Sequence, residues 1–227
     1  MIRVHVICEG QTEEMFINEV LAQAFHHLDI YLTPALIGKP GHKGGNFRFE
    51  RLLTDVEKRL LGDRQAYCTT FFDFYGLPEE FPGKVDASSR NTMNEKADCL
   101  LEAMIDKLQR KLGDEAMRRF IPYVQMYEFE GLLFSCPRRL AAGINKPALE
   151  DKFLRIRNEF DTPETINNSP VTAPSKRLLK LYEGYDKPLH GSPLPLKSAC
   201  PPFARNASGS TLGSDTLKHC NRSNKKM

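Results

Sequence analysis

The spacing of apolar residues in the first two thirds of the chain alternates between the period of a strand and that of a helix. Short runs rich in β-branched and aromatic residues predict buried strands at 2–8, 29–37, 66–72 and 119–126. Apolar residues at helical spacing predict amphipathic helices at about 13–27, 48–61 and 92–112. Thr12 is the expected N-cap of the first helix. Pro34 predicts an edge position for the second strand, because proline cannot donate to a ladder.

Strands that alternate with amphipathic helices are typical of an α/β fold with a mainly parallel sheet and helices on both faces. Beyond about residue 136 the pattern becomes helical, most clearly at 147–159 and 174–183. We therefore expect an α/β core at 1–135, followed by a helical extension of the same domain at 136–191.

Residues 192–227 differ in composition from the rest of the chain. They contain four prolines and six serines, with six Lys/Arg against the single acid Asp215. This composition predicts an irregular or disordered tail, and a shifted reading frame is an alternative explanation of it. The remaining residues carry 26 basic and 28 acidic side chains. The sequence pI of about 8.5 therefore does not indicate that the body binds nucleic acid.

Several classes of protein are excluded at this stage. No apolar run approaches the ~20 residues that a membrane-spanning helix needs, and the first apolar run leads into acids rather than a signal-peptide cleavage site. We expect a cytoplasmic protein that does not contact a membrane. The six cysteines include no C-x-x-C pair, so neither structural zinc nor a disulfide framework is expected. Cys8 and Cys68 lie inside predicted strands and are expected to be buried.

Carboxylates follow three of the predicted strands. Glu9 directly follows the first and Asp73 the third, and Glu128 follows the fourth after one intervening residue. The carboxyl ends of parallel strands lie at one edge of a sheet, where ligands bind. Carboxylate oxygens are the ligands that Mg²⁺ and Mn²⁺ prefer. The sequence therefore predicts an acidic metal site at this edge.

These acids also have structural explanations. Glu13 and Glu130 lie where helices begin, so each either adds a metal ligand or complements a helix dipole, and the same holds for Glu128. Asp73 either binds metal or bonds its own backbone in a turn.

Basic residues occur in two candidate phosphate-binding segments. The glycine-rich loop 38–45 resembles a phosphate-cradling loop, but it lacks the G-x-x-x-x-G-K-[ST] spacing. Its candidate phosphate contacts are Lys39, His42 and Lys43. Lys176 and Arg177 open a predicted helix, where cations oppose the dipole; an anionic partner or a solvated first turn explains them.

Five blocks in order, ICEGQTEEMFI, FFDFYGLP, YEFEGLLF, APSKRLLKL and YDKPLHG, resemble domain-of-unknown-function family 4276, a group of bacterial Toprim-like proteins. The resemblance covers about residues 1–191 and ends after Gly191. It implies a Toprim-like fold: a compact parallel sheet with flanking helices. The broader group includes topoisomerases, primases and OLD-type nucleases, which use acidic residues with Mg²⁺ in phosphoryl transfer on nucleic acid.

The resemblance also implies roles for individual residues. Glu9 is similar to the Toprim glutamate after strand one, and Glu13 to a second glutamate of OLD-type nucleases. Asp73 is similar to the first aspartate of the Toprim Asp-x-Asp, whereas Tyr75 stands in place of the second. That position of the implied metal site therefore has no carboxylate.

Further residues complete the implied site. Glu128 or Glu130 would replace the missing metal ligand, and Lys176 resembles a charge-stabilising lysine, with Arg177 beside it.

Two hypotheses about function follow. The first is a Mg²⁺- or Mn²⁺-dependent phosphodiesterase or nuclease acting on nucleic acid, with a role in bacterial defence beside an AAA- or ABC-type ATPase. The second is a non-catalytic Toprim-like module that binds a nucleotide or a partner ATPase.

Overall fold

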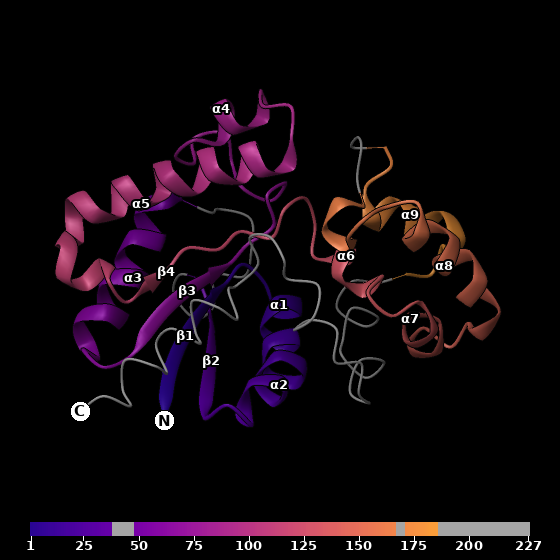
Figure 1. Ribbon diagram of the computed structural model, residues 1–227, viewed down its shortest axis with the longest axis horizontal. Coiled ribbons are helices and arrows are strands. Elements are labelled where there is room, and N and C mark those ends of the chain that lie inside the picture. The colour runs from indigo at the N-terminus through magenta and orange to yellow at the C-terminus, as the bar shows by residue number, and fades with distance from the viewer. Residues whose placement is uncertain (38–47, 167–170, 186–227) are drawn as a thin grey trace.

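A computed structural model describes residues 1–37, 48–166 and 171–185 (Figure 1). Within these residues the strands form a four-stranded sheet in the order β2-β1-β3-β4, with every neighbouring pair parallel. The strands are β1 (Ile2–Cys8), β2 (Ile30–Leu36), β3 (Tyr67–Phe71) and β4 (Phe120–Ile121). The predicted α/β fold is confirmed. Lys43 and the tail at 192–227 lie outside the described residues.

Helices connect the strands and continue the chain after β4. Those of the first part are α1 (Gln11–Phe16), α2 (Ala22–His26), α3 (Phe49–Gly62), α4 (Lys84–Ser88) and α5 (Met93–Met117), with a π-helical turn at Ile17–Leu21 between α1 and α2. Those of the second part are α6 (Glu130–Leu133), α7 (Pro137–Gly143), α8 (Glu150–Asn158) and α9 (Pro174–Leu181). Short 3₁₀ turns lie at Pro147–Leu149 and Pro163–Thr165.

Element ends account for most of the differences from the sequence prediction. Gly10, not Thr12, is the N-cap residue of α1, and Thr12 is buried within the helix. The fourth strand is shorter than predicted, because Pro122 has no N–H to donate and regular pairing ends at Ile121. One further bridge forms beyond it, between Asp73 and Gln125. The edge position predicted from Pro34 is confirmed, since β2 is one of the two edge strands of the sheet.

Each face of the sheet carries its own hydrophobic cluster. One cluster joins alternate residues of β1, such as Val4 and Val6, to α1 and to the helices that follow residue 129. The other joins the opposite face, including Ile7, to α3 and α5. Figure 1 shows α6–α9 next to α1, with α3 and α5 across the sheet from them. Cys8 and Cys68 are fully buried, as predicted.

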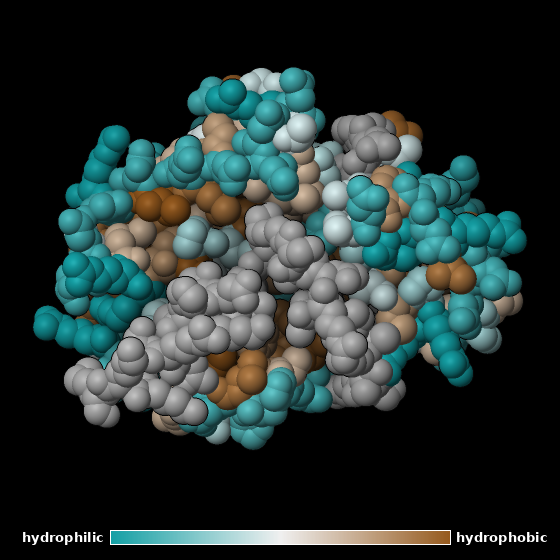
Figure 2. Space-filling model, in the orientation of Figure 1, coloured by the Kyte–Doolittle hydropathy of each residue, from teal (hydrophilic) through white to brown (hydrophobic). Residues whose placement is uncertain are grey.

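Polar and apolar residues are both visible on the face drawn in Figure 2. Figure 2 shows hydrophilic residues along the outer side of α4 and α5, with apolar residues visible beneath α5. Across the described ranges, no helix has the length and apolar character needed to cross a membrane.

Candidate functional site

The candidate site lies where the strand order reverses. β1 lies between β2 and β3, so the connection after β1 and the connection after β3 run in opposite directions across the sheet. Accordingly α1 packs in one hydrophobic cluster, whereas α4 and α5 pack in the other. In open parallel sheets this divergence leaves a crevice at the carboxyl ends of the two strands, and ligands bind there. Glu9 and Asp73 both come from these strand ends.

The Glu9 carboxylate lies against the turn that follows β3. A methyl group at Gly76 would lie 2.6 and 2.7 Å from the two carboxylate oxygens of Glu9, which is closer than atoms pack. The Gly76 N–H donates to the carbonyl of Asp73 at 3.0 Å, so Gly76 closes the turn that Asp73 begins. Gly76 therefore gives the Glu9 carboxylate room to lie against the Asp73–Gly76 turn.

The Glu13 carboxylate lies close to Gly10, the residue that follows Glu9. Its side chain is buried, with 4% exposed, although it belongs to the first turn of α1. One carboxylate oxygen lies 2.9 Å from the position that a Cβ of Gly10 would occupy. Burial, and then the negative charges of Glu13 and Glu14, raise the pKa of the Cys8 thiol. Glu13 thus folds back toward the end of β1, near Glu9 in sequence.

Asp73 anchors the segment that leads into α6. Its side chain is buried, with 7% exposed, and Oδ1 accepts a hydrogen bond from the Phe129 N–H at 2.8 Å. The backbone on either side also pairs with this segment, since the Phe74 N–H donates to Gln125 and the Tyr75 N–H donates to Tyr127. Asp73 therefore combines a structural contact with its position at the crevice.

Glu128 points to a different helix from the one that follows it. Oε2 accepts a hydrogen bond from the Ser175 N–H at 2.9 Å, and Oε1 accepts one from the Ser175 hydroxyl at 3.1 Å. Ser175 lies in the first turn of α9, where backbone N–H groups lack partners and favour a negative charge. Glu130 is buried in the first turn of α6, with 3% exposed. Metal binding by Glu128 and Glu130 stays a prediction.

The predicted acids do not form one compact cluster. Among residues 1–37, 48–166 and 171–185, no group of three or more His, Cys, Asp or Glu side chains is arranged to hold a metal ion. Glu9 contacts the Asp73–Gly76 turn, and Asp73 contacts the segment before α6. By donor chemistry the carboxylates suit a hard divalent cation.

Comparison with protein families finds a family model that matches most of the chain. A model described as a domain of unknown function (DUF4276) matches residues 8–210. The chain belongs to the DUF4276 family. Since the match continues to residue 210, the end of the resemblance at Gly191 was placed too early. No curated protein and no solved structure matches this DUF4276 chain.

The predicted cations of the DUF4276 chain have different surroundings. Arg177 donates from Nε to the Thr172 carbonyl at 2.8 Å and from an Nη to Glu159 at 3.3 Å, and its guanidinium stacks 5.0 Å from the Phe160 ring. These contacts join α9 to the end of α8. Lys176 is exposed on the first turn of α9. Lys43 lies outside the described residues, so its phosphate-binding role stays a prediction.

Lys84 is a candidate functional residue that the sequence did not reveal. It is buried, with 8% exposed, and its Nζ donates to the Phe74 carbonyl and lies 3.6 Å from the Phe74 ring centroid. Burial lowers the pKa of Lys84 to about 8, with a further contribution from the charge of Lys96. Gly83, which directly precedes Lys84, is the N-cap of α4 and has a φ of 74°.

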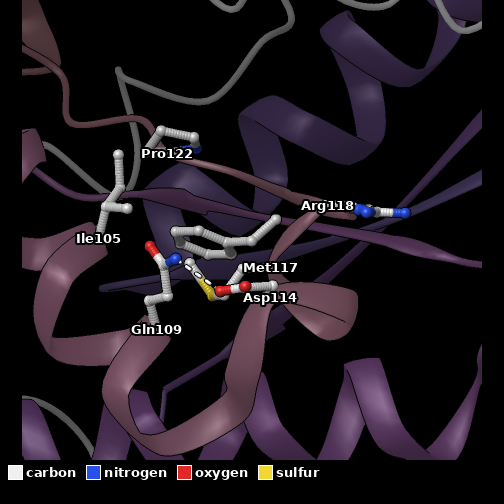
Figure 3. A pocket seen from close by; sticks show the side chains of 7 residues that line it. Ile105, Gln109, Asp114, Met117, Arg118 and Pro122 are labelled. Atoms are coloured by element: carbon white, nitrogen blue, oxygen red, sulfur yellow. Dashed lines mark hydrogen bonds between the residues drawn. The ribbon is translucent and has the colours of Figure 1, made fainter.

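A cavity of about 340 Å³ lies away from the candidate site at Glu9 and Asp73 (Figure 3). Its walls come from the second half of α5 and from the start of β4, and Gln109 donates to Asp114 across one side at 2.7 Å. Phe120 on its wall pairs with Cys68 near the amino end of β3. The cavity is therefore separate from the crevice at the carboxyl ends.

Proposed function

We propose that this DUF4276 protein is a divalent-metal-dependent phosphodiesterase that acts on nucleic acid. The observation that carries the proposal is the packing of the Glu9 carboxylate against the Asp73–Gly76 turn at the point where the strand order reverses. The Toprim-like resemblance of the same residues supports it, because that group uses these acids with Mg²⁺.

The donor set suits an ion that keeps much of its water. Mg²⁺ is commonly bound by one or two carboxylates together with water and substrate phosphate, so it does not need a preformed cage of three acids. Glu9 and Asp73 would hold it. Glu128 is left out of this pair because Ser175 donates hydrogen bonds to both of its carboxylate oxygens. When bound, the ion would polarise the scissile phosphate and lower the pKa of an attacking water.

The other residues would act around this pair. Glu13, buried beside the turn at Gly10, would orient the pair or accept a proton. Lys84 would place a positive charge behind the Phe74–Tyr75 backbone, and Lys176 would supply a second from α9. A role in bacterial defence and an AAA- or ABC-type ATPase partner belong to the same proposal.

The direct test is cleavage of plasmid and single-stranded substrates with Mg²⁺ or Mn²⁺. We expect Glu9→Gln and Asp73→Asn to reduce cleavage by about 100-fold or more, since each removes a ligand of the ion. Glu115→Gln is the matched control, because this acid lies on α5 with its side chain 88% exposed. If the full chain neither cleaves nor binds Mn²⁺ by calorimetry, the phosphodiesterase proposal is wrong.

A steric variant tests the same geometry without removing a carboxylate. Gly76→Ala places a methyl group against Glu9, whereas Gly62→Ala at the end of α3 meets no atom within 4 Å. Gly76 does not have a positive φ, so alanine fits its backbone. We expect Gly76→Ala to weaken Mn²⁺ binding by about tenfold, and Gly62→Ala to leave it unchanged. Equal affinities of the two variants would contradict the pairing of Glu9 with the turn.

A non-catalytic module is the second candidate. It is favoured by Tyr75 in place of an aspartate and by the lack of a three-acid cluster in the described part of the chain. Such a module would bind a nucleotide or a partner ATPase at the same crevice. Calorimetric binding of ATP in EDTA, in a protein without cleavage activity, would favour it.

A further inference from the structure

Three aromatic rings and two lysines form one cluster at the edge of the crevice. The rings are Phe74, Tyr75 and Tyr127, with centroid distances of 5.9 Å, 6.4 Å and 5.6 Å for the pairs 74–75, 74–127 and 75–127. Lys84 Nζ lies 5.9 Å from the Tyr75 ring, and Lys96 Nζ lies 5.9 Å from the Tyr127 ring. We call these five residues the tyrosine platform.

The platform is built next to the carboxylates. Tyr75 directly precedes Gly76, against which the Glu9 carboxylate packs. The Tyr75 N–H donates to the Tyr127 carbonyl at 3.1 Å, so the two tyrosines are fixed to each other through the backbone. A group that stacks on Tyr75 would therefore lie beside the residue that contacts the Glu9 carboxylate, next to the proposed cleavage site.

The outer ring is exposed although the Phe74 ring that it contacts is buried. The Tyr75 side chain is 39% exposed, whereas Phe74 beneath it is 2% exposed. Tyr127 has a φ of 67°, a conformation that bulky residues seldom adopt and that costs about 1–3 kcal/mol. The hydrogen bond from Phe129 to Asp73 holds the chain just beyond this residue. Packing of the hydrophobic core explains neither the strained backbone of Tyr127 nor the exposed ring of Tyr75.

The chemistry of the platform matches an unpaired base with its phosphate. Tyrosine faces stack on any base, and nearby lysines attract the backbone phosphate. In a duplex both faces of each base are already stacked, so an aromatic platform has access to bases only in single strands or at unpaired positions. The body is also near neutral, whereas binding a duplex through its phosphates requires many cations.

We propose that the tyrosine platform stacks an unpaired base of single-stranded nucleic acid, with Tyr75 as the principal contact. This rests on the proposed phosphodiesterase function and names its substrate as a single strand. Tyr75, in the place of the second Toprim aspartate, then serves substrate binding rather than metal binding.

The test is binding of a fluorescein-labelled single-stranded oligonucleotide of about 12 nucleotides to the full chain in EDTA, followed by anisotropy. We expect Tyr75→Ala to weaken binding by about 5-fold to 150-fold, the range seen when one stacked base is lost. Tyr75→Phe keeps the ring and should retain most of the affinity. Tyr31→Ala is the matched control, because Tyr31 is also 39% exposed but lies on β2. Tyr127→Ala should also weaken binding.

An abasic oligonucleotide and a duplex of the same sequence decide between explanations. With a stacked base, the Tyr75→Ala effect disappears on the abasic strand, and the duplex binds more weakly than the single strand. The proposal is overturned if wild-type protein does not bind the strand, if Tyr31→Ala has the same effect, or if the Tyr75 effect persists on abasic or duplex probes. Because EDTA removes metal, the result does not depend on cleavage, and Glu9→Gln in the cleavage assay tests the phosphodiesterase proposal separately.

Discussion

Lys84 is a buried cation whose principal contacts are a carbonyl oxygen and an aromatic ring. Its pKa is lowered to about 8 from the ordinary 10.5, so between these values the unfolded chain binds more protons than the folded one. Stability from this group therefore rises as pH increases from 8 to 10.5, and the full penalty is present below pH 8.

A comparison with Lys84→Met measures this effect. We compare the unfolding free energy of wild type with that of Lys84→Met by urea denaturation at each pH. When pH is raised from 7.5 to 9.5, we expect the free energy of wild type to increase by about 1–2 kcal/mol relative to that of the variant. Lys107→Met is a suitable control, because Lys107 is exposed on α5 and lies 4.9 Å from the Phe49 ring. A constant difference between wild type and Lys84→Met at all pH values would show that Lys84 is not desolvated.

The sequence was enough to place Glu9 and Asp73 at the ends of neighbouring strands, but not to predict what the predicted acids contact. Glu9 and Asp73 follow apolar runs, and parallel pairing then brings the ends of those runs to one edge. Glu128 follows the same pattern, yet its partner Ser175 lies 47 positions away. Contacts of that separation depend on how helices pack, which periodicity does not report. Lys84 was missed for a similar reason, since it follows an irregular segment with two prolines.

At the scale of elements, the contact between Glu128 and Ser175 fixes the start of α9. Glu128→Ala removes the acceptor of an N–H in the first turn of this helix, and we expect a loss of about 1 kcal/mol of stability. Hydrogen exchange should become faster in α9 and remain unchanged in α3. Glu164→Ala is the control, because this acid lies in the 3₁₀ turn at Pro163–Thr165 that precedes α9.

The same variant also separates the two roles given to Glu128. If Glu128 were a metal ligand, Glu128→Ala would weaken Mn²⁺ binding as strongly as Glu9→Gln does. If it only anchors α9, faster exchange in the helix should come with nearly unchanged Mn²⁺ affinity. An unchanged exchange rate in α9 would contradict the anchoring role.

Element types were easier to predict than element ends. α5 extends beyond the predicted limit of residue 112, because the chain turns at Gly113 with a φ of 76° and then continues as helix to Met117. β4 is shorter than predicted, since Pro122 ends its ladder. Both differences depend on single residues that interrupt a backbone pattern, whereas the apolar period averages over ten or more positions.

At the scale of the molecule, the helices after residue 129 share a hydrophobic cluster with β1 and α1. Phe153 on α8 is fully buried in this cluster and packs edge-on against Phe134 at 5.9 Å. Leu154, its neighbour on α8, is 44% exposed. These two positions allow a comparison of buried and exposed side chains within one turn of the same helix.

Because the cluster is shared, the sheet and the later helices should unfold together. We expect Phe153→Ala to lower the unfolding free energy by about 3–5 kcal/mol, and Leu154→Ala by less than about 1 kcal/mol. Urea denaturation followed by far-ultraviolet circular dichroism should show one transition, which Phe153→Ala shifts as a whole. Two transitions, with only one sensitive to Phe153→Ala, would mean that the later helices fold independently. The crevice would then be formed by the sheet without support from α9.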